Sequence, residues 1–154
     1  NEMDMELREQ FFTIINHFRR LESALMAECE MQINEMAVLY SIAGNCCQEC
    51  PNINLNVPKI QEKLCISKPA VSYILNALEK KNYITREIDS RDRRKVSIGV
   101  TEEGKEVAEQ SMGKYEELWS EILERFGEEN MRQLVDLLRE LDHCTSDNTE
   151  EKKG

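Results

Sequence analysis

Residues Leu55 to Thr101 read LNVPKIQEKLCISKPAVSYILNALEKKNYITREIDSRDRRKVSIGVT, and this stretch decides the fold. Four apolar residues in its middle recur at helical spacing and predict an amphipathic helix: Val71, Ile74, Leu75 and Leu78. A step of about 100° per residue places Ser72, Tyr73 and Asn76 on the opposite face. Their hydroxyl, phenol and amide groups suit base edges and phosphates. The helix could therefore pack with one face and read DNA with the other.

A shorter helix and a tight turn precede this helix. Asn56 can cap the shorter helix, and Pro58 falls in its first turn, where a missing N–H costs nothing. The turn ends at Ser67, which can cap the second helix. Together the two helices predict a helix-turn-helix. Its candidate DNA-binding residues are Ser67, Lys68, Pro69, Ala70, Ser72, Tyr73 and Asn76.

Two strand-like runs follow, over 84–88 and 96–100, and predict a small β-wing. The segment between them is too polar and charged to be core. A basic loop of this kind suits the DNA backbone or the minor groove. Leu55 could pair with the wing as a further short strand. The candidate DNA-binding residues of the wing are Arg91, Asp92, Arg93, Arg94 and Lys95.

The order of these motifs resembles the MarR family of winged-helix transcriptional regulators. The resemblance is carried by the helix-turn-helix, by the Asp-x-Arg-Asp-x-Arg pattern and by the Thr-Glu-Glu-Gly that follows; it covers nearly the whole chain apart from the polar tail. It implies that Arg94 lies at the wing tip and that Asp92 helps to orient it. Cys65 and Asn82 stand where glycine is frequent in such proteins, a departure at two backbone turns.

Composition sets broad limits. A chain of 154 residues is one domain's length, so we expect a single MarR-like domain over 1–154. The net charge is −10, yet Lys59 to Lys105 holds eleven basic and seven acidic residues, a local +4 that leaves −14 elsewhere. An acidic protein can still bind DNA when its basic residues are gathered on one surface. With neither a signal-peptide pattern nor a membrane-length apolar run, we expect a soluble, cytoplasmic protein.

Long helices are expected on both sides of the winged helix-turn-helix, which we place at 33–101. Apolar residues at alternating four and three spacing predict helices within 4–28 and 102–144, and the polar residues 145–154 predict a disordered tail. The first and last helices could pack together within one chain. Their excess of apolar surface and the family resemblance favour dimerisation helices and a two-fold homodimer, the symmetry that a pseudo-palindromic operator requires.

An effector site and the cysteines are less well defined. The resemblance implies a sensing site for a small molecule, a metal or an oxidant, and Phe11, Met36 and Tyr40 could line it, although such residues are more often plain core. Cys46, Cys47 and Cys50 are weak candidates for zinc or for a thiol-based redox sensor. We favour structural or incidental thiols, since six cysteines in an intracellular chain are expected to be reduced.

The fold class is thus mainly α with a small β-wing, a winged helix-turn-helix flanked by long N- and C-terminal dimerisation helices. The leading hypothesis is a sequence-specific regulator that binds double-stranded DNA, a homodimeric repressor responding to a ligand or to stress. The alternatives are a winged helix used for protein contacts and a redox sensor based on the cysteines. With two distant histidines and no glycine-rich phosphate loop, we expect neither an enzyme nor a cofactor.

Overall fold

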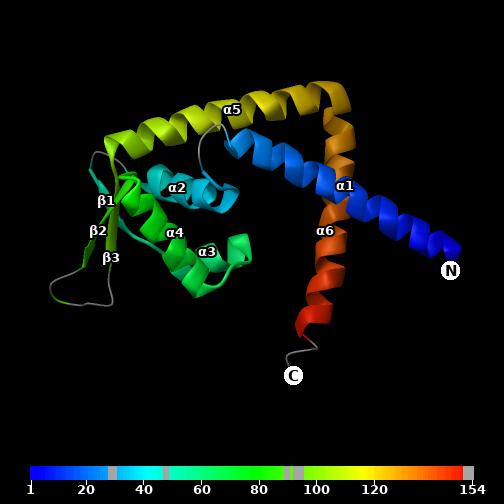
Figure 1. Cartoon of the computed structure of the whole chain (residues 1–154), viewed down its shortest axis with the longest axis horizontal. Helices are drawn as coiled ribbons and strands as arrows, with labels where there is room; N and C mark the ends of the chain where they lie inside the picture. Colours follow the sequence, from blue (N-terminus) through cyan, green and yellow to red (C-terminus); the bar gives the residue numbers. More distant parts are fainter. Residues whose placement is uncertain (28–30, 47–48, 89–90, 92–95, 151–154) are drawn as a thin grey trace. The chain divides into compact units, whose positions relative to one another are not determined.

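The computed structural model describes residues 1–27, 31–46, 49–88, 91 and 96–150. It has two compact units, Asn1–Gly113 and Lys114–Gly154, with the boundary inside one long helix. Among the described residues, no helix is both long and apolar enough to cross a membrane. The elements, labelled in Figure 1, are α1 (Glu2–Ala27), α2 (Ile33–Asn45), β1 (Asn52–Asn54), α3 (Val57–Leu64), α4 (Lys68–Lys80), β2 (Ile84–Ile88), β3 (Val96–Val100), α5 (Glu102–Phe126) and α6 (Glu128–Glu150).

The first unit contains an antiparallel sheet in the order β1-β3-β2. The pairing of Ile84 with Val100 and of Ile88 with Val96 sets the register of β2 and β3, which confirms the predicted wing strands. The third strand is Asn52–Asn54, so the expectation that Leu55 joins the sheet is wrong by one residue. Helices α2 and α4 pack beside this sheet (Figure 1).

The core of this unit is formed by side chains from α2, α3, α4 and the sheet. Leu39 and Ile42 of α2, Leu78 of α4 and Ile98 of β3 are almost completely buried. The apolar stripe predicted for 71–78 is buried in full, which confirms the inward face of α4. Burial of four such side chains stabilises the helix on the sheet far more than helix propensity does.

Both helices of the helix-turn-helix begin at the predicted caps. The Asn56 side chain accepts a hydrogen bond from the Lys59 amide at 3.1 Å, and the Ser67 hydroxyl oxygen accepts one from the Ala70 amide at 3.2 Å. Cys65 and Asn82 have φ values of 52° and 63°, in the left-handed region that glycine adopts most easily. Cys65 and Asn82 therefore adopt the backbone conformation that a glycine would adopt at these two positions.

The last helix is longer than expected. Helix α6 runs to Glu150, so the prediction of a disordered tail from residue 145 is wrong for 145–150. The Thr145 hydroxyl lies within hydrogen-bonding distance of the Leu141 and Asp142 carbonyl oxygens, and no glycine or proline interrupts this polar segment. Residues 151–154 lie outside the described part of the chain. That the chain forms a single domain also stays a prediction.

An ion pair joins α2 to the end of α4. The Glu35 carboxylate is almost buried and lies 2.8 Å from the Lys81 ammonium. We expect Lys81→Met to lower the free energy of unfolding by about 1–3 kcal/mol, because a buried carboxylate would lose a charged donor. Urea denaturation measures the change. The double variant Glu35→Gln/Lys81→Met should recover part of the loss, whereas unchanged stability in Lys81→Met would show that the pair contributes nothing.

Candidate nucleic-acid interface

Helix α4 exposes polar side chains on the face opposite the core. Ser72, Tyr73 and Asn76 are all exposed, and Tyr73 retains 69% of its surface. The structure thus brings the three predicted reading residues onto one side of one helix. An exposed helix with a phenol, a hydroxyl and an amide on one side has the dimensions and chemistry to enter a major groove.

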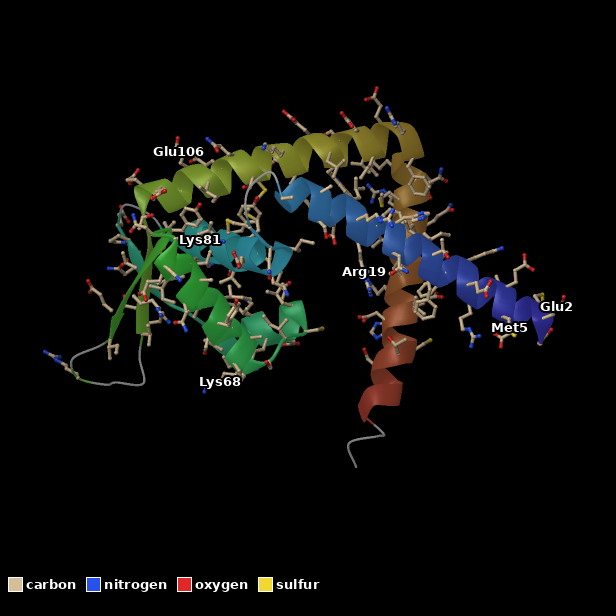
Figure 2. All side chains as sticks on the ribbon, in the orientation of Figure 1. Glu2, Met5, Arg19, Lys68, Lys81 and Glu106 are labelled. Carbon is tan, nitrogen blue, oxygen red and sulfur yellow. The ribbon has the colours of Figure 1, made fainter. Side chains whose placement is uncertain are left out.

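The N-terminal end of α4 carries positive potential. Lys68, labelled in Figure 2, is exposed in the first turn beside Pro69. The Ser67 oxygen is occupied by the Ala70 amide, so Ser67 has a capping function and Ala70 is half-buried behind it. The remaining helix-end amides and the Lys68 ammonium favour an anion such as a phosphate.

Arg86 of β2 reaches the exposed face of α4 and contacts two side chains there. Its Nη2 donates to Asn76 Oδ1 at 2.5 Å and to Glu79 Oε1 at 2.9 Å, and its Nε donates to Glu79 Oε2 at 3.3 Å. These hydrogen bonds lower the pKa of the Glu79 carboxyl below its ordinary value, although desolvation acts in the opposite direction. Sequence reasoning named Asn76 and missed its partner Arg86.

The wing is only partly described. Strands β2 and β3 are in place, and Arg91 between them is exposed. The other predicted wing contacts, Asp92, Arg93, Arg94 and Lys95, lie outside the described residues. Their role at the DNA backbone or the minor groove stays a prediction.

The three residues named for an effector site have different surroundings in the described part of the chain. A cavity of about 760 Å³ lies between α2, β1 and the start of α3; Tyr40 is among its lining residues, while Phe11 and Met36 are not. Met36 is 2% exposed and belongs to the core, whereas Phe11 is exposed on α1. The cavity also has polar and basic lining residues that sequence reasoning did not single out, among them Asn52, Asn56, Lys59 and Lys63.

The structure describes two of the three cysteines in the cluster. Cys46 is half-buried and Cys50 is exposed at the cavity, while Cys47 lies outside the described residues. Where the structure describes the chain, it contains no group of three or more His, Cys, Asp or Glu side chains placed to hold a metal ion. A zinc site that includes Cys47 therefore stays untested.

Two capped helices joined by a tight turn and followed by the wing strands β2 and β3, with β1 completing the sheet, define a winged helix-turn-helix protein. Residues 45–96 match the model of the MarR family. This match covers α3, α4 and β2 and confirms the resemblance to the MarR family seen in the motifs.

Curated relatives and solved structures are similar over different lengths. The HTH-type transcriptional regulator FarR of Neisseria gonorrhoeae is 34% identical over 58% of this chain and 62% of its own length. The homoprotocatechuate degradative operon repressor of Escherichia coli is 32% identical over 51% of this chain and 53% of its own. The chain thus matches about half to three fifths of these relatives. The MepR–DNA complex of S. aureus has the same fold, with a TM-score of 0.71 and 21% identity over 89% of this chain and 96% of that one.

Proposed function

We propose that this protein is a sequence-specific regulator of transcription that binds double-stranded DNA as a homodimeric repressor. The observation that carries the proposal is the division of α4 into a buried apolar face and an exposed polar face. The free side carries a phenol, a hydroxyl and an amide, groups that can hydrogen-bond to base edges and phosphates. The relatives FarR, a transcriptional regulator, and the E. coli protein, an operon repressor, support the same assignment.

In this proposal α4 enters the major groove and the wing follows the backbone. Ser72, Tyr73 and Asn76 face base edges, while Lys68 and the α4 amides face a phosphate. The basic loop of the wing, which contains Arg91, contacts the neighbouring backbone or the minor groove. The net charge of +4 over 59–105 favours this surface for DNA, and the acidic remainder limits nonspecific binding.

A homodimer is part of the proposal because α1 and α6 both carry stripes of exposed apolar side chains. Leu7, Phe11, Ile14 and Phe18 recur along one face of α1, and all are exposed. On α6, Leu134, Leu138 and Leu141 repeat the pattern. Large exposed apolar stripes mark interfaces. A two-fold dimer would bury them and would present two α4 helices to a pseudo-palindromic operator.

An effector completes the proposal. The cavity lined by Tyr40 lies between α2 and the helix-turn-helix, so an occupant there would contact elements that support α4. A small molecule or an oxidant acting on the neighbouring Cys50 could in this way shift the position of the reading helix. No catalytic role is proposed for any residue.

The alternative of a protein-binding winged helix is disfavoured by the same face of α4. Cores of protein interfaces are rich in apolar and aromatic anchors and poor in charge. The exposed face of α4 offers one aromatic residue, Tyr73, among polar and charged neighbours. This composition suits a nucleic acid better than a protein partner.

Substitution of Asn76 and substitution of Lys68 should cause two different defects in DNA binding. Asn76→Ala should reduce the preference for the operator over unrelated DNA by about 1–3 kcal/mol, because it removes a contact to a base edge. Lys68→Ala should weaken binding to all sequences alike and reduce the slope of log affinity against log salt by about 1, because it removes a contact to a phosphate. Fluorescence anisotropy at several salt concentrations measures both.

Lys105→Ala is the matched control, since it removes the same charge from the start of α5. The affinity of Lys105→Ala for the operator should stay close to that of the wild type. If Asn76→Ala and Lys68→Ala both bind operator and unrelated DNA as the wild type does, α4 is not the reading helix.

A further inference from the structure

The contact between Arg86 and Asn76 joins a wing strand to the reading face of α4. Arg86 is fixed by two hydrogen bonds to Glu79, which lies one helical turn beyond Asn76. With its guanidinium held in this way, Nη2 also donates to Asn76 Oδ1. The Arg86 side chain retains 26% of its surface, so the contact is partly shielded from water. Three side chains from two elements thus hold one another in place.

The chemistry of arginine fixes which end of the Asn76 amide faces it. A guanidinium has only donors, whereas a side-chain amide has a carbonyl oxygen on one branch and an NH₂ group on the other. Because Oδ1 of Asn76 faces Arg86, the NH₂ group occupies the branch that points away from Arg86. An asparagine free to rotate could present both groups side by side to adenine N6 and N7. Because Arg86 holds Oδ1, Asn76 presents its NH₂ group, a hydrogen-bond donor, on the side away from Arg86.

We propose that Arg86 is a positioning residue that makes Asn76 a hydrogen-bond donor toward the major groove, and that it thereby sets the base preference at one operator position. The proposal rests on the proposed function. Guanine offers the two acceptors O6 and N7 at the groove edge, so it is favoured at this position. Cytosine offers the N4 donor there and is rejected. Adenine, which pairs a donor with an acceptor, is intermediate.

Arg86 also neutralises Glu79, and that effect has to be separated from positioning. Without Arg86, the exposed Glu79 carboxylate would repel phosphates and lower the affinity for every sequence. Such a loss would not depend on the base opposite Asn76. Loss of positioning, by contrast, changes the relative affinities for guanine and adenine at one position and leaves the other positions as they were. The two effects therefore have different signatures.

The test is selection of binding sites from random duplexes by the full chain and by variants, followed by sequencing. Asn76→Ala identifies the position that Asn76 reads. Arg86→Ala should reduce the preference for guanine over adenine at that position from roughly tenfold to near parity. The double variant Glu79→Ala/Arg86→Ala has the wild-type net charge, and it should show the same relaxed preference. Wild-type preference in the double variant would mean that Arg86 acts by charge alone, which would overturn the proposal.

A second variant keeps the ion pair intact. Asn76→Asp has nearly the same shape, and one carboxylate oxygen can still accept from Arg86. The other oxygen replaces the NH₂ group, so the preference should shift from guanine toward the donor-bearing cytosine. Circular dichroism melting confirms that each variant is folded at the selection temperature. If Asn76→Asp still prefers guanine at this position, the result would contradict the proposal.

The outcomes separate this inference from the proposed function. If the wild type enriches no sequence, the proposed function fails and this inference fails with it. If the wild type enriches an operator and Asn76→Ala alters one position, the function stands. In that case an unaltered guanine preference in Arg86→Ala would refute the positioning role alone.

Discussion

Phe11→Asp is expected to convert the protein from a dimer to a monomer and to abolish high-affinity operator binding. Phe11 is 44% exposed in the single chain and lies at the centre of the apolar face of α1. In the proposed dimer this face is covered by the partner, so an aspartate would bury an unpaired charge at a cost of several kcal/mol. Because two half-sites must be bound together, loss of the dimer removes most of the affinity.

The matched control adds the same charge to the opposite face of α1. Asn16 is exposed there, about half a turn away from the apolar stripe, and Asn16→Asp is nearly isosteric. Light scattering at micromolar concentration should show a dimer for the wild type and for Asn16→Asp. Leu138→Asp on α6 should behave like Phe11→Asp. A wild type that is monomeric at this concentration would remove the basis of the dimer.

Gly104→Ala should destabilise the start of α5 by about 1–3 kcal/mol, even though alanine is the better helix former. A Cβ at position 104 would collide with the carbonyl oxygen of Tyr83. That carbonyl cannot move easily, because it accepts a hydrogen bond from the Thr101 amide at 3.0 Å. The Thr101 hydroxyl in turn donates to the Asn82 carbonyl at 2.7 Å and accepts from the Gly104 amide at 2.9 Å. The glycine therefore allows α5 to begin against the turn that ends α4.

Gly113→Ala is the control within the same helix. A Cβ at position 113 would meet no atom within 4 Å, so the substitution should raise stability by up to about 1 kcal/mol. Thermal unfolding should thus move in opposite directions for the two variants, by roughly 2–4 °C per kcal/mol in a chain of this size. Equal melting temperatures for Gly104→Ala and the wild type would contradict the close approach of α5 to Tyr83.

The helix-turn-helix was predictable because its signals are local. The caps Asn56 and Ser67 and the stripe of Val71, Ile74, Leu75 and Leu78 act within a few residues of the chain, and each is found where the sequence places it. Thr101 likewise caps α5 as expected, with its hydroxyl on the Gly104 amide. Hydrogen bonds between neighbours in sequence need no knowledge of the tertiary fold.

Strand β1 and the end of α6 were less predictable for different reasons. Asn52–Asn54 has three residues with one β-branched side chain, Ile53, too short a run to predict a strand. It becomes a strand through pairing with β3, more than forty residues away. The segment 145–150 is polar, and its composition predicted disorder. It continues an established helix, and extending a helix costs less than starting one.

Some residues of the candidate site could likewise be predicted from local sequence, whereas others depend on tertiary packing. The exposed face of α4 follows from helical periodicity, so Ser72, Tyr73 and Asn76 were found from the sequence alone. The contact between Arg86 and Asn76 depends on the packing of β2 against α4, and no local sequence pattern predicts it. The cavity beside Tyr40 is likewise formed by α2, β1 and α3 together, so its lining residues Asn56 and Lys59 could not be named from the sequence alone.

The central claim is that α4 reads a defined DNA sequence in a two-fold complex. Its most direct test is selection of duplexes from a random pool by the purified wild-type protein, followed by sequencing of the bound fraction. We expect enrichment of a pseudo-palindrome whose half-sites lie about one helical turn, roughly 10 bp, apart. A bound fraction with the same sequence composition as the starting pool would contradict it.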